Sequence, residues 1–156
     1  MWLRPVVPAD RPSFEAGFTS LSERSRYLRF HRPVAGLSEQ VWHALVDEVD
    51  QDRHIALLLL AGRDPVGVGR VVRSADDPAT VDLAITVRDE WQGRGVGTAL
   101  AREVLAAAGG VRRIETVILE ENVAAMRLLA SLGTPMTERS GRTLRVTVDL
   151  VELRAA

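Results

Sequence analysis

The segment Gln92-Gly93-Arg94-Gly95-Val96-Gly97-Thr98 has the composition of a loop that binds a phosphate. Glycine allows a backbone to approach a ligand closely and to adopt a positive φ. A helix-like segment follows the loop, so N–H groups at the start of that helix would point toward one spot, where the helix dipole favours an anion. We therefore predict that this loop binds a phosphate or pyrophosphate through its backbone.

The spacing of the glycines distinguishes this loop from two common nucleotide-binding loops. A P-loop needs a lysine after its last glycine, and the chain has no lysine, because all 20 basic residues are arginine. A dinucleotide-binding loop has the spacing GxGxxG and an acid about 20 residues later. This loop has the spacing GxGxG, and Val117 stands where the acid would be. A glycine-rich turn that binds no ligand is the remaining alternative.

Several other chemistries are excluded by residue type. The chain has no cysteine, which excludes disulfides, thiolate metal sites and a cysteine nucleophile. Its three histidines, His31, His43 and His54, lie far apart in sequence, so we expect no metal site. The net charge of −1 provides no basic field for nucleic acid or a membrane. With no signal peptide and no long apolar run, we expect a cytoplasmic enzyme.

The elements that must position the glycine loop are clear from their patterns. Val81–Val87 alternates apolar and polar residues, as a strand does. The helix after the loop has Leu100 and Val104 on one face and ends at Gly109. Residues 113–119 form a further strand, and a helix capped by Asn122 runs from there to Leu132.

The amino-terminal half contains a short edge strand, Trp2–Val7, and several helix starts. Three helix N-termini are indicated by Asp10, by a capping box of Ser20 and Glu23, and by Ser38. The apolar run 55–60 predicts a buried strand, with residues 66–72 as its hairpin partner. Residues 144–148 form the last strand, and residues 134–141 are interpreted as a loop. The length and the absence of a linker predict one mixed α/β domain over residues 1–156.

Two motifs resemble those of the GNAT superfamily of N-acetyltransferases. Gln92-x-x-Gly95-x-Gly97, between a strand and a helix, resembles the acetyl-CoA loop of that superfamily. Glu121–Leu128, followed by Leu132-Gly133, resembles its second motif, and the likeness extends from Val81 to Gly133. The resemblance implies the GNAT fold, with a mixed, mostly antiparallel sheet of six to seven strands flanked by about four helices.

The resemblance also implies roles for individual residues. Acetyl-CoA would be the co-substrate, bound by the loop Gln92, Gly93, Arg94, Gly95, Val96, Gly97 and Thr98. The backbone N–H groups from Arg94 to Thr98 would hold its pyrophosphate. Ile85 and Val87 would pair through their backbone with the pantetheine arm, at a wedge where their strand separates from 113–119. A backbone N–H near Val87 would polarise the acetyl carbonyl. Asn122 would reach the cofactor near the thioester, and an amine would attack directly, with no acyl-enzyme.

Asp82 is the candidate general base, because an amine must lose a proton before it attacks. It lies on the face of its strand opposite Val81 and Leu83, where a carboxylate could take a proton directly or through water. The alternative is a solvated or salt-bridged strand aspartate. Glu120 and Glu121 are the reserve candidates. Many GNAT enzymes have a tyrosine that protonates the leaving thiolate, but the matching position here is Leu129.

The amino-terminal half adds a narrower resemblance. Leu21–Phe30 and Asp52–Leu57 are similar to segments of bacterial protein-lysine acetyltransferases of the Pat-like group. Those domains often carry a carboxylate, usually glutamate, at the position of Asp82, and often lack the tyrosine. Within the second segment, His54 is interpreted as a polar residue at a strand end rather than as a catalytic group.

These patterns together predict an N-acetyltransferase that moves an acetyl group from acetyl-CoA to a primary amine. A protein lysine is the first candidate acceptor, and a small amine such as an amino acid, a polyamine or an aminoglycoside is the alternative. A non-catalytic acyl-CoA sensor is the competing hypothesis from another class. We expect no metal, no nucleic acid and no membrane partner, and a homodimer as the oligomeric state.

Overall fold

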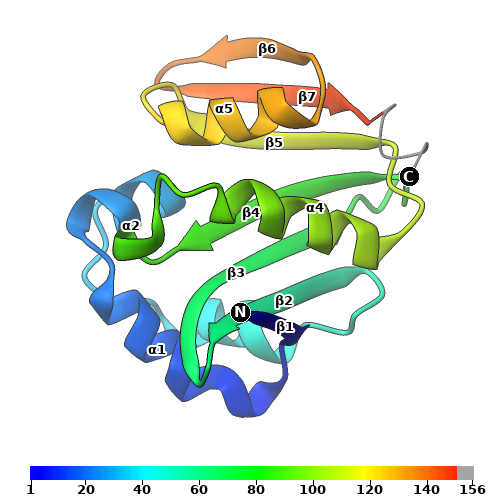
Figure 1. The fold of residues 1–156 in the computed structure, drawn as a ribbon. Coiled ribbons are helices and arrows are strands. Elements are labelled where there is room, and N and C mark those ends of the chain that lie inside the picture. The colour runs from blue at the N-terminus through cyan, green and yellow to red at the C-terminus, as the bar shows by residue number, and fades with distance from the viewer. Residues whose placement is uncertain (151–156) are drawn as a thin grey trace.

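A single mixed sheet organises the described part of the protein, which is residues 1–150 of the computed structural model (Figure 1). The seven strands follow the order β1-β2-β3-β4-β5-β7-β6, and every neighbouring pair is antiparallel except β4 and β5. This confirms the predicted fold class. The strands are β1 (Trp2–Pro5), β2 (His54–Ala61), β3 (Asp64–Arg73), β4 (Thr80–Val87), β5 (Arg113–Leu119), β6 (Pro135–Ser140) and β7 (Thr143–Asp149).

Helices pack on the two faces of this sheet. Five α-helices lie within residues 1–150: α1 (Arg11–Ser20), α2 (Glu23–Phe30), α3 (Glu39–Trp42), α4 (Val96–Ala108) and α5 (Val123–Leu132). Short helical turns are η1 (Pro8–Asp10), η2 (His43–Asp47) and η3 (Asp89–Trp91). Figure 1 shows α4 crossing one face of β3 and β4, with α5 beside β5 and β7. No helix in this range is long and apolar enough to cross a membrane.

Strand β2 shows how the sequence builds two cores at once. Ile55 belongs to a main cluster that it shares with α4, α5 and the carboxy-terminal strands. Its neighbours Ala56 and Leu58 belong to a second cluster with Phe18 of α1 and Trp42 of α3. Because successive side chains of a strand point to opposite faces, a strand buried on both faces must be a continuous apolar run. The run observed in the sequence therefore indicates helices on both faces.

Two of the predicted helix caps are wrong in detail. The Asp10 carboxylate accepts hydrogen bonds from Arg4, at 2.6 and 2.8 Å, and from the N–H of Val7 at 2.8 Å, and not from an N–H of α1. Helix α2 is capped by Ser22, whose hydroxyl accepts from Ser25 N–H at 3.0 Å, and not by Ser20. Buried Leu21 has an extended backbone, which moves the helix start two residues later than the capping-box pattern suggested.

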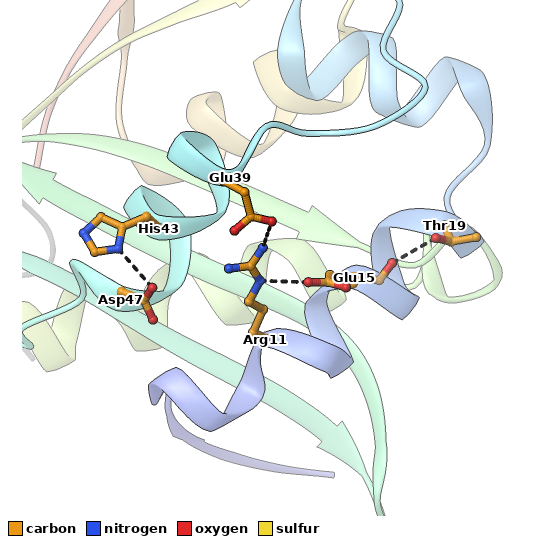
Figure 2. A network of polar contacts seen from close by, with 6 residues as sticks. All are labelled: Arg11, Glu15, Thr19, Glu39, His43 and Asp47. Carbon is orange, nitrogen blue, oxygen red and sulfur yellow. Dashed lines mark hydrogen bonds and ion pairs between the residues drawn. The ribbon is translucent and has the colours of Figure 1, made fainter.

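The segment after Ser38 also differs from its expected form. Ser38 does cap α3, because its hydroxyl accepts from Val41 N–H at 3.2 Å. The helix has only four residues before it widens into the π-helical turn η2. An ion pair joins this segment to α1 (Figure 2): Arg11 contacts Glu39 at 2.6 Å, and within α1 it also contacts Glu15 at 2.8 Å.

The segment interpreted as a loop, residues 134–141, contains strand β6. It pairs with β7 from Pro135↔Val148 to Ser140↔Thr143. Most of its residues are exposed, because β6 is the edge strand of the sheet. An exposed edge strand has no alternating apolar pattern, so its sequence resembles that of a loop.

Candidate active site

The glycine-rich loop joins β4 to α4 and leaves the start of that helix open. Gly95 has a φ of 80° and stands immediately before the first helical residue, Val96. The first hydrogen bond of the helix runs from Ala99 N–H to Gly95 O at 3.1 Å. The N–H groups of residues 96–98 precede that bond, so they are available to an anion at the positive end of the helix dipole.

Gln92 attaches this loop to neighbouring elements. Its side-chain amide donates to the carbonyl of Val87 at 2.9 Å and to the hydroxyl of Ser25 at 3.3 Å. Asp89 accepts from the same hydroxyl at 3.1 Å. The amino terminus of α2 is therefore bound to the loop, a connection that the local sequence pattern did not reveal. Arg94 lies over the ring of Trp91, with its Cζ 5.2 Å from the ring centroid.

Strands β4 and β5 separate along their length. They pair only through Thr80↔Arg113 and Val81↔Ile114, near their starts. Figure 1 shows the gap that opens between them beyond these pairs. A Cβ placed on Gly97 would lie 3.5 Å from Leu128 of α5, 3.7 Å from Ile85 and 3.8 Å from Val87. The loop, the end of β4 and α5 therefore meet at this gap, which brings most of the predicted cofactor residues together.

Asp82 is exposed on β4, one residue past the last β4–β5 pair. Its Oδ1 accepts a hydrogen bond from the Thr116 hydroxyl of β5 at 2.7 Å. The pair therefore bridges the two strands where they begin to separate. Thr116 was not among the predicted site residues, although a threonine between the buried residues Ile114 and Ile118 of β5 was a usable signal.

The end of α2 contributes charge beside Asp82. Burial lowers the pKa of Arg29, and the negative charge of Asp82 opposes that shift. Burial and Arg29 also lower the pKa of His31, which Asp82 again opposes. His31 has a left-handed backbone, with φ 64°. These side chains, which are remote in sequence, thus form the electrostatic surroundings of the candidate base.

The reserve acids and the second motif lie at the start of α5. Glu120 forms an ion pair with Arg139 at 2.6 Å, and the carboxylate of Glu121 lies 4.0 Å from the guanidinium of Arg24. The side-chain oxygen of Asn122 accepts from Ala125 N–H at 3.1 Å, which confirms the predicted cap of α5. Leu129 is only 3% exposed and belongs to the main core, so this position offers no proton donor.

A partly open cavity of about 90 Å³ lies beside β4, against the helices α1–α3. Thr86 and Arg88, at the end of β4, are among the residues that line it. Within residues 1–150, no group of three or more His, Cys, Asp or Glu side chains could hold a metal ion. The arrangement thus combines a helix start with N–H groups open to a ligand, a strand gap, one carboxylate and an adjoining cavity.

Comparison with known proteins agrees with this geometry. Residues 1–134 match the family model described as the acetyltransferase (GNAT) domain. The chain is 28% identical over 156 residues to acetyltransferase Pat of Mycolicibacterium smegmatis, covering 96% of this chain and 45% of that protein. It is 26% identical to acetyltransferase PA5475 of Pseudomonas aeruginosa, covering 84% of this chain and 73% of that protein.

A solved structure shows the same fold. The GNAT domain of S. lividans PAT superposes with a TM-score of 0.84 at 25% identity, covering 95% of this chain and 89% of that one. The chain spans less than half the length of the Mycolicibacterium smegmatis relative.

Proposed function

The chain belongs to the GNAT family of acetyltransferases, and from this premise we propose that it transfers an acetyl group from acetyl-CoA to a primary amine. One observation carries the proposal: the start of α4 opens beside the gap between β4 and β5. A pyrophosphate at that helix start would leave the rest of an extended cofactor free to run along the exposed edge of β4. A folded domain without this activity needs neither feature.

The cofactor roles assigned from the sequence are part of this proposal. The N–H groups of Arg94, Gly95, Val96, Gly97 and Thr98 would surround the pyrophosphate. Gln92 and Gly93 would complete the loop, although the N–H of Gln92 already binds Asp89 and its side chain binds Val87. The backbone of Ile85 and Val87 would pair with the pantetheine arm. The amide nitrogen of Asn122 would contact the cofactor, because its oxygen caps α5.

In the proposed reaction, the amine nitrogen attacks the thioester carbonyl and the carbon–sulfur bond breaks. Asp82 takes the proton of the amine, directly or through water. The thiolate leaves without a tyrosine donor, because Leu129 is buried. Thr116 holds Asp82 by one oxygen only, so the other oxygen can accept the proton.

Two classes of acceptor have support. The resemblance of Leu21–Phe30 and Asp52–Leu57 to Pat-like protein-lysine acetyltransferases favours a protein lysine, and the chain is similar to acetyltransferase Pat over most of its length. The cavity beside β4 favours a small amine, because a concave, mostly apolar pocket with a few polar groups is typical of a site for a small molecule. The third possibility is a sensor that binds acyl-CoA without turnover, and an experiment must distinguish it from both kinds of enzyme.

The test is calorimetric titration with acetyl-CoA, followed by a CoA-thiol release assay with lysine-containing proteins and small amines. We expect binding, and thiol release that depends on an amine. Absence of binding would refute the proposal and make the loop a turn without a ligand. Binding without release from any amine would identify a sensor.

A cytoplasmic location, a homodimer and the absence of nucleic-acid or membrane partners stay predictions from the sequence. Light scattering after size-exclusion chromatography tests the dimer.

A further inference from the structure

The cavity beside β4 has an apolar, largely aromatic wall. It lies between α1–α3 and the face of β2–β4 that is turned away from α4. Apolar side chains from these helices, from the segment between α2 and α3 and from η2 line it: Phe14, Phe18, Phe30, Leu37, Trp42 and Leu45. Such a wall predicts a ligand with an apolar body.

Arg70 of β3 places a buried positive charge in this cavity. The residue is 6% exposed, and its guanidinium donates to the carbonyl of Leu45 at 2.7 Å and to His54 Nε2 at 3.0 Å. Burial and the charge of Arg70 lower the pKa of His54 to about 4, so this partner is neutral at pH 7. Burial, together with the charge of Arg29, lowers the pKa of Arg70 to about 9, so Arg70 remains positively charged.

Two more arginines line the same cavity, Arg29 of α2 and Arg88 after β4. Arg88 pairs with Glu90 at 2.8 Å, but its buried Nε has no hydrogen-bond partner within residues 1–150. None of the ion pairs in the described range includes Arg29 or Arg70. Within residues 1–150, the cavity therefore holds two guanidinium groups that form no ion pair, although the charge of Asp82 acts on Arg29, and a third group with an unused donor.

A buried charge without a partner is unfavourable, and an anion in the cavity would compensate it. The guanidinium group matches a carboxylate or a phosphate through paired hydrogen bonds. A carboxylate suits this site better, because the rest of the wall is apolar and the cavity is small. A polyamine or an aminoglycoside would instead be repelled.

The position of the cavity relates it to the acetyl-CoA gap. Thr86 lines the cavity, whereas its neighbours Ile85 and Val87 point toward Gly97 at the gap. Only strand β4 therefore lies between the two spaces. A ligand held in the cavity would lie across β4 from the place proposed for the thioester, and its amine would have to reach past the end of that strand.

We propose that this cavity is the acceptor site and that the acceptor is a small primary amine with a carboxylate and an apolar body, held through Arg29 and Arg70. The assignment rests on the acetyltransferase function proposed above. It deepens that function by choosing the small-amine class and, within it, compounds that resemble an apolar amino acid.

Three matched probes test the site without acetyl-CoA: phenylalanine, phenylpropionate, which lacks the amine, and phenethylamine, which lacks the carboxylate. Calorimetry or ligand-observed NMR on the full chain should detect binding of phenylalanine and of phenylpropionate. The protein should bind phenethylamine at least about tenfold more weakly. Arg70→Gln should weaken the binding of phenylpropionate by at least about tenfold. Because Arg70 is buried, its substitution could affect folding. Arg29→Gln, at a half-buried position, is therefore the second variant, and it should also weaken the binding of phenylpropionate.

Arg63→Gln removes the same charge from an exposed turn and is the control that should bind normally. Equal binding of phenylpropionate and phenethylamine, or unchanged binding by both cavity variants, would overturn the inference. Tighter binding of phenyl phosphate would overturn the choice of a carboxylate. Because these titrations contain no acetyl-CoA, failure here is distinct from failure of the acetyl-CoA titration.

With acetyl-CoA present, the protein should release CoA thiol faster with phenylalanine as the acceptor than with phenethylamine. Arg29→Gln should remove this difference in rate. The assignment of the acceptor would be overturned if the protein acetylated lysine-containing proteins but not phenylalanine, and if Arg29→Gln left that acetylation unchanged.

Discussion

At the scale of single residues, the site depends on how each polar group is held. Asp82 is exposed, but the Thr116 hydroxyl fixes one of its oxygens at 2.7 Å. His54 is half-buried and receives a hydrogen bond from Arg70. The same residue types on an open surface would have many orientations, so the neighbouring strand in each case determines what the side chain can do.

The role of Asp82 can be tested by Asp82→Asn, which preserves the size of the side chain but removes the base. We expect turnover to fall ~10²-fold or more, the usual effect of losing a general base. The affinity for acetyl-CoA, measured by calorimetry, should stay within about twofold. Asp76→Asn, at an exposed turn, is the matched control. Unchanged turnover across the whole pH range would refute the assignment.

The pKa of His54 predicts how stability depends on pH. The unfolded imidazole takes a proton near its ordinary pKa of about 6.5, whereas burial and Arg70 lower the folded pKa to about 4. The contribution of neutral His54 to the free energy of unfolding is therefore fully present above pH ~6.5 and is lost as the pH falls toward 4.

His54→Gln retains an acceptor for Arg70 but cannot titrate. The loss of unfolding free energy between pH 7 and 4.5 should be smaller in this variant by about 1 kcal/mol, after allowance for solvent screening. Urea titrations at a series of pH values would measure it, with His43→Gln, at an exposed position, as the control. Parallel curves for the wild type and His54→Gln would contradict the prediction.

At the scale of elements, the start of α4 is held by its neighbours rather than by the glycine loop alone. Gln92 binds the end of β4, and Ser25 of α2 binds both Gln92 and Asp89. The helix start and the end of β4 therefore keep a fixed distance. A ligand that contacts both loses less conformational entropy on binding when the two are already in place.

Gly97→Ala separates folding from cofactor binding. Its Cβ would have ordinary contacts of 3.5–3.8 Å with Leu128, Ile85 and Val87, so the variant should fold. Because that Cβ enters the gap proposed for acetyl-CoA, affinity should fall at least about tenfold.

The unfolding free energy of Gly97→Ala should remain equal or rise by up to about 1 kcal/mol, since alanine favours a helix. Gly17→Ala, in α1 with nothing within 4 Å of its Cβ, is the matched control and should bind normally. Normal affinity in Gly97→Ala would place the cofactor elsewhere.

At the scale of the whole molecule, the gap divides the sheet into two parts. One part contains β1–β4, and the other contains β5–β7 with α5. Two backbone pairs, the hydrogen bond between Thr116 and Asp82, and the main core are among the connections that join them. A cofactor in the gap would contact both parts and would stabilise the native state as a unit.

Acetyl-CoA should therefore raise the melting temperature. At 100 times its dissociation constant, a ligand that binds only the native state adds about 2.7 kcal/mol of stability. For a domain of this size the shift is roughly 5–10 °C. Thermal unfolding followed by circular dichroism would measure it, with Gly97→Ala as the variant that loses the shift. An unchanged melting temperature at high acetyl-CoA would contradict binding.

Much of this architecture could be read from short stretches of sequence. The alternation in Val81–Val87, the glycines after it and the Asn122 cap are local features. Each follows from the strand period, from positive φ or from hydrogen bonds that span a few residues. The strand 113–119, the helix it precedes and the glycine loop were predicted where the structure has them.

Other features required the folded chain. The hydroxyl that holds Asp82 is 34 residues away, and the carbonyl that Arg70 binds is 25 residues away. Strand β6 pairs but is exposed, and Asp10 binds Arg4 instead of capping a helix. These contacts depend on which surfaces meet after the sheet has formed, because a side chain binds the best partner that packing brings within reach, wherever that partner lies in the sequence.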